Sequence, residues 1–361
     1  MEENNFTPAN ENIPADGTHS ESAQNPGQVA GNFAAPEMMY GGAANPGIAR
    51  IREMVQKIRT ELHKVVVGQD EMIDLMLVGL FTNGHILLEG VPGIAKTVSA
   101  KLLAKSISTG FSRMQFTPDL MPTDIVGTSI FNLKTSEFNF VKGPVFSNIV
   151  LIDEINRSPA KTQAALFEVM EERQVTVDGT TYKMGFPFMV LATQNPIEQE
   201  GTYKLPEAQL DRFLFRVKLK YPSLSEEIQI LTRFREDFSS NVINTVNPVI
   251  SPDEIKYCQS EVEKIFIKDE LIKYIAAIVD STRNNPELFL GASPRASLSI
   301  MKSAKALAAI NGRGFVTPDD IQYVAVPVMN HRMILSPEVE LEGTEIEDVI
   351  KSVIKKIEVP R

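Results

Sequence analysis

The chain has 361 residues, 43% hydrophobic and 23% charged, a composition typical of ordinary globular proteins and long enough for about two domains. Its formal net charge of -10 argues against non-specific binding to nucleic acid or anionic lipid, since both require Lys and Arg to displace counterions. The single cysteine, Cys258, excludes an internal disulfide, and the four scattered histidines lack metal-ligand spacing, so we expect a reducing compartment.

The first 47 residues are rich in Asn, Gly, Ala, Pro and Glu and show almost no aliphatic periodicity. Such a segment buries too little apolar surface to offset the entropy of ordering, so we predict a disordered tail over 1–47. A docking segment around 33–40 is the alternative. The first Lys or Arg is Arg50, unlike a secretory signal, and no apolar run approaches the roughly 20 residues that span a bilayer. We therefore expect a cytoplasmic protein without a transmembrane helix.

The segment 48–222 alternates helical stretches with short β-rich runs. Its first helix is predicted by apolar residues spaced along one face, namely Ile51, Met54, Val55, Ile58 and Leu62. The expected strands are 85–89, 111–116, 148–152, 188–192 and 213–219. This alternation predicts an α/β domain in which helices cover both faces of a parallel sheet.

Two β-hairpins are expected to interrupt the α/β pattern. The clearer one covers 174–182, where Asp178 and Gly179 supply the positive φ angles of a type I′ turn. The second would pair 129–132 with 138–141 through a turn at 134–137. The simplest interpretation is that both hairpins are structural insertions without a functional role.

Beyond residue 222 the strands are expected to stop, leaving an all-helical second domain over 223–361. The helix-start signals are Ser223 with Glu226, Ser251 with Pro252 and Glu254, Ser293 with Pro294, Thr317 with Pro318 and Asp320, and Thr344 with Glu347. The last helix carries an apolar stripe between Ile346 and Ile357, which predicts packing on a core or, alternatively, on a neighbouring subunit.

A glycine-rich loop follows the first expected strand and precedes a helical run. Its residues are Gly90, Val91, Pro92, Gly93, Ile94, Ala95, Lys96 and Thr97. Because consecutive backbone N–H groups at a helix N-terminus attract polyphosphate, Lys96 would reach the β- and γ-phosphates and Thr97 would ligate Mg²⁺. Ala95 stands where the motif usually ends in glycine, so a simple Gly/Pro turn before a helix is the alternative.

Polar residues follow two of the expected strands at the edge where ligands bind to parallel sheets. The run 149–152 ends in Asp153 and Glu154, and 188–192 leads to Asn195. Asp153 would hold Mg²⁺ through water, and Glu154 would orient or deprotonate the attacking water. Asn195 could also orient that water, or it could simply form a turn before proline.

Together these motifs resemble the MoxR-type ATPases of the AAA+ superfamily, over roughly 48–340. The segments that carry the resemblance are Val67-Gly68-Gln69, the loop 90–97, Leu151 to Arg157, Leu191 to Pro196, Leu205 to Phe213 and Gly291 to Ala296. The alanine at position 95 is tolerated in this family. The resemblance implies a P-loop αβα core followed by a smaller helical lid, assembled as a ring, usually hexameric, with ATP and Mg²⁺ at each subunit interface.

The resemblance also implies roles for individual residues. Asn195 matches the sensor 1 asparagine, Arg212 the arginine finger that reaches a neighbouring subunit's γ-phosphate, and Arg295 the sensor 2 arginine of the lid. Arginines suit this task because phosphoryl transfer places charge on the equatorial oxygens. The alternatives are Arg216 as the finger, with Arg157 and Arg332 as weaker candidates. Further nucleotide-binding residues are Gly68, Gln69 and Val98.

MoxR-like proteins remodel or activate partner proteins, often those bearing a von Willebrand factor A domain, and the resemblance implies the same chaperone-like role here. A nucleic-acid motor or loader is the alternative, since related AAA+ rings use comparable hairpins on DNA, although the acidic balance disfavours it. The acid Glu154 argues against a scaffold that binds nucleotide without hydrolysing it. The sequence contains no Asn-Lys-x-Asp segment of the kind that selects guanine, so a GTPase is not indicated.

Overall fold

The computed structural model describes residues 46–91, 93–195, 202–203, 205–235 and 244–360. The predicted tail as far as residue 45, Pro92 and the segment that follows Asn195 lie outside these ranges. The described residues belong to one compact unit. Within the described residues, no helix combines the length and apolarity needed to cross a bilayer.

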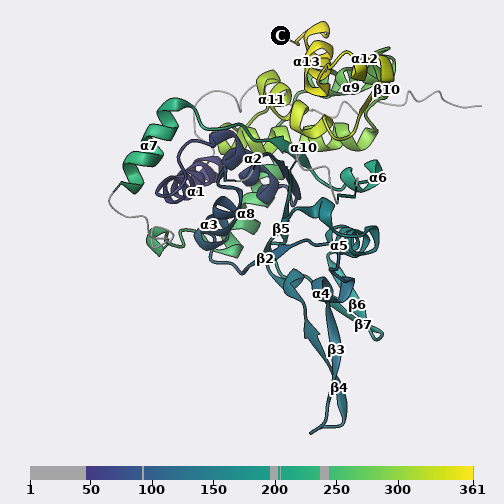
Figure 1. The fold of residues 1–361 in the computed structure, drawn as a ribbon. Helices are drawn as coiled ribbons and strands as arrows, with labels where there is room; N and C mark the ends of the chain where they lie inside the picture. The colour runs from purple at the N-terminus through teal and green to yellow at the C-terminus, as the bar shows by residue number, and fades with distance from the viewer. Residues whose placement is uncertain (1–45, 92, 196–201, 204, 236–243, 361) are drawn as a thin grey trace, which may run out of the picture. The chain divides into compact units, whose positions relative to one another are not determined.

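A five-stranded parallel sheet forms the centre of the first half of the unit (Figure 1), confirming the predicted fold class. Its order is β2 (Phe111–Gln115), β5 (Ile149–Asp153), β8 (Met189–Gln194), β1 (Ile86–Glu89) and β9 (Phe215–Lys218). Because all five strands run the same way, their last residues share one edge, here termed the carboxyl edge. The opposite edge, where the strands begin, is the amino edge.

Helices cover both faces of this sheet because its side chains alternate between two apolar cores. Leu88 of β1 belongs to the core that includes α1 (Pro46–His63), α2 (Asp70–Phe81) and α3 (Lys96–Ser106). Leu87 points into a second core with α5 (Ala160–Glu172). The predicted apolar face of α1 is buried as expected. However, this helix begins at Pro46, so 46–47 are helical rather than part of the predicted tail.

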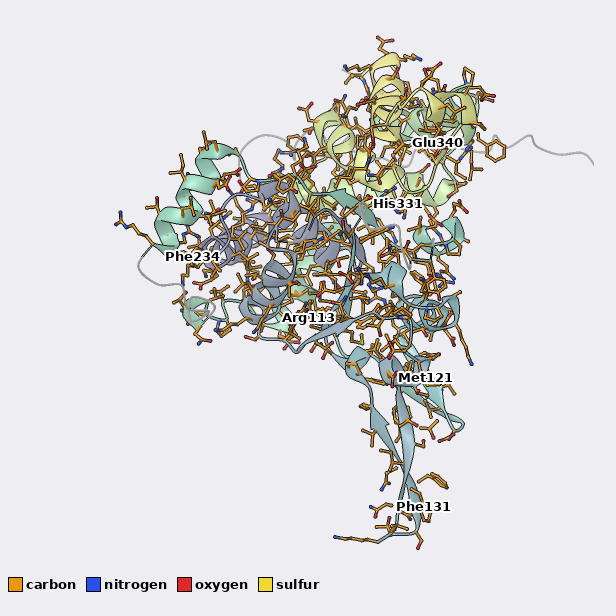
Figure 2. All side chains as sticks on the ribbon, in the orientation of Figure 1. Arg113, Met121, Phe131, Phe234, His331 and Glu340 are labelled. Carbon is orange, nitrogen blue, oxygen red and sulfur yellow. The ribbon has the colours of Figure 1, made fainter. Side chains whose placement is uncertain are left out.

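Both predicted hairpins are present as separate two-stranded ribbons. Strands β6 (Gln174–Val177) and β7 (Thr180–Lys183) meet at Asp178 and Gly179, whose φ angles are 49° and 75°. Strands β3 (Gly127–Asn132) and β4 (Glu137–Lys142) follow the short helix α4 (Pro122–Val126). Figure 2 shows Phe131 near the far end of this second ribbon. The ribbon's connection is 133–136, one residue earlier than predicted.

The region after β9 is mainly helical. Its helices are α7 (Leu224–Phe234), α8 (Pro252–Glu263), α9 (Asp269–Arg283), α10 (Pro294–Ile310), α11 (Pro318–Met329), α12 (Pro337–Leu341) and α13 (Ile346–Lys356), preceded by α6 (Glu207–Leu210). Capping boxes begin α7, α8 and α11 at the predicted residues, and Ser293 is the N-cap of α10.

Two predictions about this region are wrong. Thr344 does not cap α13: its N–H bonds to Val339 O, 3.4 Å away, and closes the preceding turn, so the helix begins at Ile346 with Glu345 as N-cap. The region is also not entirely helical, because β10 (Leu288–Leu290) pairs antiparallel with β11 (Ile334–Leu335). These strands are too short to display a two-residue periodicity.

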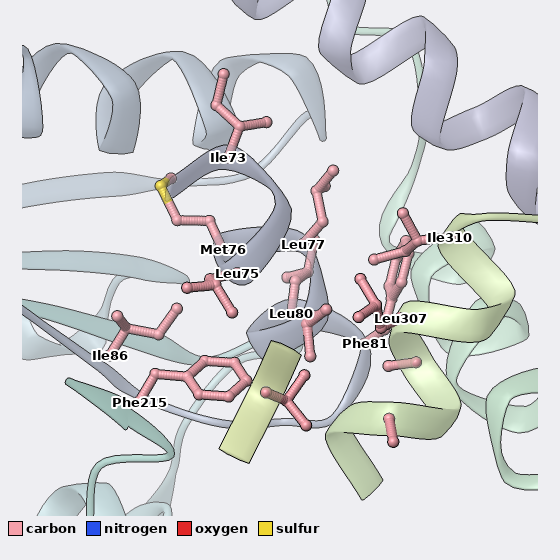
Figure 3. Close-up of a cluster of buried hydrophobic side chains, with 14 of the residues drawn as sticks. Ile73, Leu75, Met76, Leu77, Leu80, Phe81, Ile86, Phe215, Leu307 and Ile310 are labelled. Carbon is pink, nitrogen blue, oxygen red and sulfur yellow. The ribbon is translucent and has the colours of Figure 1, made fainter. Parts of the chain in front are cut away.

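The helical region shares a continuous apolar core with the sheet domain. Figure 3 shows α2 between the sheet and α10: Leu75 and Leu80 lie on the side of Ile86 and Phe215 of the sheet, and Phe81 lies beside Leu307 and Ile310 of α10. The stripe of α13 is likewise buried, mainly against α9 and α11, which agrees with its interpretation as core.

Candidate functional site

The loop between β1 and α3 begins at Gly90, which lies close to Ile94 and Leu219. A Cβ at Gly90 would lie 2.7 Å from Ile94 Cδ1 and 3.3 Å from Leu219 O, so a larger residue would require these neighbours to move. Gly93 and Ala95 have φ angles of 89° and 61°. The left-handed conformation costs a residue with a side chain roughly 1–2 kcal/mol, which makes alanine the smallest departure from glycine at position 95. Pro92, predicted to belong to the loop, lies outside the described residues.

Lys96 begins α3 and lies among acidic groups at the carboxyl edge. Its Nζ donates a hydrogen bond to Gly90 O at 2.6 Å. Burial lowers the pKa of Lys96, while the charges of Asp153, Glu154 and Glu89 act in the opposite direction. The structure thus brings the predicted lysine and the two predicted acids together. The neighbouring residues Val91, Thr97 and Val98 are all partly exposed.

Asp153 ends β5 with its carboxylate held on both sides. Thr193 Oγ1 donates to Asp153 Oδ1 at 3.2 Å, and Arg113 Nε donates to Oδ2 at 2.6 Å. The Asp153 side chain is only 10% exposed, whereas that of Arg113 is 54% exposed. The carboxylate therefore already neutralises a cation at the position where a divalent ion was predicted.

Glu154 adopts a left-handed backbone conformation, with φ of 56°. Its N–H donates to Thr193 Oγ1 at 3.0 Å. Gln115 Nε2 donates to its Oε2 at 2.7 Å, and Arg157 Nε forms an ion pair with the same oxygen at 2.9 Å. This carboxylate is consequently oriented by two side chains, one of which comes from the neighbouring strand β2.

Asn195 follows β8 and is buried, with 8% of its surface exposed. The preceding residue, Gln194, accepts a hydrogen bond from Gly90 N at 3.2 Å and pairs with Glu89 in the sheet register. Asn195 therefore emerges beside the glycine-rich loop, at the same edge as the acids.

Gly68 and Gln69 form a left-handed turn before α2, with φ angles of 65° and 60°. Gln69 Nε2 donates to Lys220 O at 3.3 Å, just beyond the carboxyl end of β9. A Cβ on Gly68 would meet Glu226 of α7. This turn and α7 therefore stand on the same side of the sheet as the loop.

Comparison with known proteins agrees with this geometry. Residues 85–215 match the ATPase family associated with various cellular activities (AAA), and 280–353 match the AAA lid domain. Chaperone MoxR1 of Mycobacterium tuberculosis is 41% identical over 94% of this chain and 90% of its own length. The chain belongs to the MoxR family of AAA+ ATPases.

Two further similarities cover most of the chain. The uncharacterised protein YeaC of Bacillus subtilis is 46% identical over 86% of this chain and 96% of its own length. A crystal structure of a candidate ATPase from Cytophaga hutchinsonii is 44% identical, covers 88% of this chain and 98% of its own, and superposes with a TM-score of 0.81. The AAA+ family as a whole implies nucleotide binding, and the helical region after β9 contains the matched lid.

In this MoxR-family chain, the predicted arginines do not join the Lys96 cluster. Arg212 Nη1 donates to Phe167 O at 3.1 Å and lies 3.4 Å from Glu171 Oε2, near the end of α5. Leu214 N donates to His85 O at 2.7 Å, which places this segment beside the start of β1. Arg212 is therefore at the amino edge, about 13–20 Å from the loop for strands of four to six residues.

Arg295, at the start of α10, belongs to the same group as Arg212. Its Nη1 donates to Asp211 Oδ2 at 3.0 Å, and its Nη2 lies 3.9 Å from Glu171 Oε1. Arg332 is different, because its side chain is only 3% exposed and donates at 2.6 Å to the other oxygen of Asp211. Arg212 and Arg295 face outward as a pair, while Arg332 is part of the interior.

Arg216, the alternative finger, points to the carboxyl edge instead. Its Nε donates to Glu89 Oε2 at 2.6 Å, next to the loop of its own chain. The sequence analysis missed Arg113 and Gln115 entirely. The two residues occupy alternate positions of β2 and so share one face, but polar residues at alternate positions are also typical of an ordinary edge strand, so this pattern alone does not identify them.

Proposed function

We propose that the chain binds ATP with Mg²⁺ at the loop 90–97 and hydrolyses it. The observation that carries this proposal is the convergence of Lys96, Asp153 and Glu154 at the carboxyl edge, beside the loop in which Gly93 and Ala95 adopt positive φ angles. Lys96 donates to Gly90 O in the structure, and bound phosphate oxygens would replace that acceptor. The turn at Gly68 and Gln69 would flank the nucleotide, and Val98 would support it from α3.

The donor set fits one Mg²⁺ ion shared with phosphate. Among the described residues, no group of three or more His, Cys, Asp or Glu could hold a metal alone. Mg²⁺ bound to a nucleotide needs only one or two protein ligands, and Thr97 and Asp153 would supply them. The 2.6 Å contact with Arg113 shows that Asp153 already carries a cation. When bound, the ion would neutralise charge on the phosphates.

Glu154 is assigned to the attacking water, because its carboxylate lies at the same edge as Lys96 and is oriented by neighbours. Gln115 and Arg157 hold Oε2, so the remaining oxygen can accept a proton or a hydrogen bond. Asn195 emerges beside it and would hold the same water or a γ-phosphate oxygen.

We further propose that a second copy of the chain completes the site. Arg212 and Arg295 lie at the amino edge and cannot reach the loop of their own chain without a large rearrangement. A head-to-tail ring, hexameric as the family suggests, would bring this pair against the neighbour's loop. The acids that hold the arginines in the isolated chain would then exchange them for phosphate oxygens. Arg216 pairs with Glu89 on the wrong side for this role.

At the level of the cell we propose that the ring remodels or activates partner proteins, in particular those with a von Willebrand factor A domain, and that it does so in the cytoplasm. In this scheme 48–222 is the nucleotide-binding domain, and 223–361 acts as the lid whose movement transmits hydrolysis. The mycobacterial relative is named as a chaperone, which supports the general role.

Three variants test the site directly. Lys96→Ala should abolish nucleotide binding, and Glu154→Gln should bind ATP without turnover and stabilise the assembly. Arg212→Ala should bind ATP normally but fail to hydrolyse it. If the finger acts between chains, mixing Arg212→Ala with Glu154→Gln should restore part of the activity, because some interfaces then combine an intact Glu154 with an intact Arg212.

Two results would contradict these assignments. Turnover of Glu154→Gln at the wild-type rate would refute the role of the acid, and inactive mixtures would refute the shared site. Affinity capture with Glu154→Gln tests the partner class by the presence or absence of von Willebrand factor A proteins. ATPase activity stimulated by DNA and suppressed by salt would instead favour a nucleic-acid motor.

A further inference from the structure

Helix α7 carries an apolar face that its own chain leaves uncovered. No residue of α7 is buried, and Leu224, Ile228 and Leu231 are 76%, 55% and 67% exposed. Their spacing of four and three residues puts them on one side of the helix, with the exposed Glu227 beside them. We call this set the α7 stripe. Three large apolar side chains aligned in this way indicate an interaction surface rather than scattered exposure.

The opposite face of α7 contacts the end of α1 and the turn at Gly68 and Gln69 that precedes α2. Arg233 Nη1 donates to His63 O at 2.8 Å, and Glu226 lies against Gly68. Ile230 and Phe234, the last residue of the helix, are partly buried. These contacts hold α7 beside the turn at Gly68 and Gln69, so the stripe lies near the site where the neighbouring chain would arrive.

A complementary surface exists at the start of α10. Arg295, Leu298 and Lys302 are exposed and, at spacings of three and four residues, share one side of that helix. Leu298 is 55% exposed and lies between two cations. This surface begins at Arg295, the residue assigned to the neighbour's phosphate.

We propose that the α7 stripe of one chain packs against the Leu298 face of α10 in a second copy. The inference rests on the proposed ring, which already brings Arg295 to the neighbour's loop and therefore brings α10 toward the neighbour's α7. The charges on the two surfaces are opposite, because the acid Glu227 borders the stripe and the cations Arg295 and Lys302 border Leu298. The contact is heterologous: each chain offers two different surfaces, which is what a closed ring requires.

Cysteine cross-linking tests the pairing in the full chain. The native Cys258 is buried, so introduced thiols are the reactive ones. After oxidation with ATP present, Ile228→Cys mixed with Leu298→Cys should form a covalent dimer, and the double variant should form a ladder of multimers. A disulfide forms only when the two Cα atoms come within about 7 Å. Self-pairing of Ile228→Cys alone, or no product from the mixture, would overturn the proposal.

Assembly provides the second test. Replacing all three apolar residues of the stripe by serine should raise the protein concentration for half-assembly by about tenfold or more in sedimentation velocity with ATP. The matched control is Leu341→Ser, since Leu341 is 89% exposed on α12, away from the stripe. Assembly of the triple variant at the wild-type concentration would overturn the proposal and leave the stripe to another occupant.

Charge reversal distinguishes a specific contact from general stickiness. Glu227→Lys should weaken assembly, and adding Lys302→Glu in the same chain should recover it, whereas failure to recover would count against the pairing. Nucleotide binding separates this inference from the proposed function. If the wild-type protein does not bind ATP, the proposed function itself fails. If the wild type binds ATP and the triple serine variant still assembles, only the inference about the stripe fails.

Discussion

Replacement of Asp211 by asparagine offers a sharp test of the packing between the sheet domain and the helical region. Asp211 is the acid that neutralises Arg332, whose side chain is 3% exposed and contacts it at 2.6 Å. The guanidinium also donates to the carbonyl oxygens of Leu214 and Phe213, at 3.2 Å and 2.6 Å. Burial lowers the pKa of Arg332, and Asp211 opposes that shift by favouring the charged form.

The size of the effect follows from leaving that charge without its acid. Removing one partner of a buried ion pair costs roughly 3–5 kcal/mol. Asp211 is 26% exposed, and asparagine keeps one oxygen acceptor, so we expect about 2–3 kcal/mol. At about 2–4 °C per kcal/mol for a domain of 150–250 residues, the midpoint of unfolding should fall by roughly 4–12 °C.

Thermal unfolding followed by circular dichroism measures this shift. The matched control is Asp280→Asn, because Asp280 is 69% exposed and lies 3.6 Å from Arg283 within one helix, so its loss should move the midpoint by less than about 1 °C. Combining Asp211→Asn with Arg332→Met should recover much of the loss, since no buried charge remains. Equal midpoints for Asp211→Asn and wild type would show that Arg332 is solvated and the reasoning wrong.

Three further outcomes are expected. Arg113→Gln removes the cation that competes for Asp153, so half-maximal hydrolysis should need severalfold less Mg²⁺, whereas Arg113→Lys should resemble wild type; an unchanged Mg²⁺ dependence would refute the competition. Burial raises the pKa of Cys258 to about 12, so an aromatic disulfide reagent at pH 8 should label it only after unfolding, and rapid native labelling would contradict its buried position. Burial lowers the pKa of His85 to about 3, so the folded chain keeps it neutral while the unfolded chain binds a proton below about pH 6.5. Stability is then greatest above that pH and should fall by about 2 kcal/mol between pH 7 and pH 5 in denaturant titrations, relative to His85→Asn, and parallel profiles for the two proteins would contradict it.

The features that local sequence predicts well are those whose cause is local. A strand, a tight loop and a helix N-terminus lie within about a dozen residues of one another around Lys96, so the pattern of residue types determines the geometry. The same holds for the type I′ turn at Asp178 and for the capping boxes at Ser223 and Ser251. In each of these cases the side chain bonds to, or sets the conformation of, its own immediate backbone.

Contacts made across the sheet could not be predicted in this way. Gln115 reaches Glu154 only because β2 is the neighbour of β5, and strand order depends on the whole fold. The same pairing puts Arg113 against Asp153. Neither residue has a local pattern that distinguishes it from an ordinary polar residue of an edge strand. The ribbon of β10 and β11 was missed for a related reason, since its pairing is non-local and its strands are short.

The arginines show how much depends on a few positions along the chain. Arg212 lies in the turn before β9 and contacts α5 at the amino edge, whereas Arg216, four residues later and within β9, contacts Glu89 at the carboxyl edge. The two contacts lie near opposite ends of β1, whose four residues span about 13 Å, more than a side chain can bridge. Since ATP would bind at the carboxyl edge, only Arg216 could act within its own chain, and Arg212 can contribute to hydrolysis only when another chain presents its loop. Assembly is therefore built into the proposed activity, and a monomeric variant that hydrolysed ATP at the full rate would show that the site is complete without Arg212.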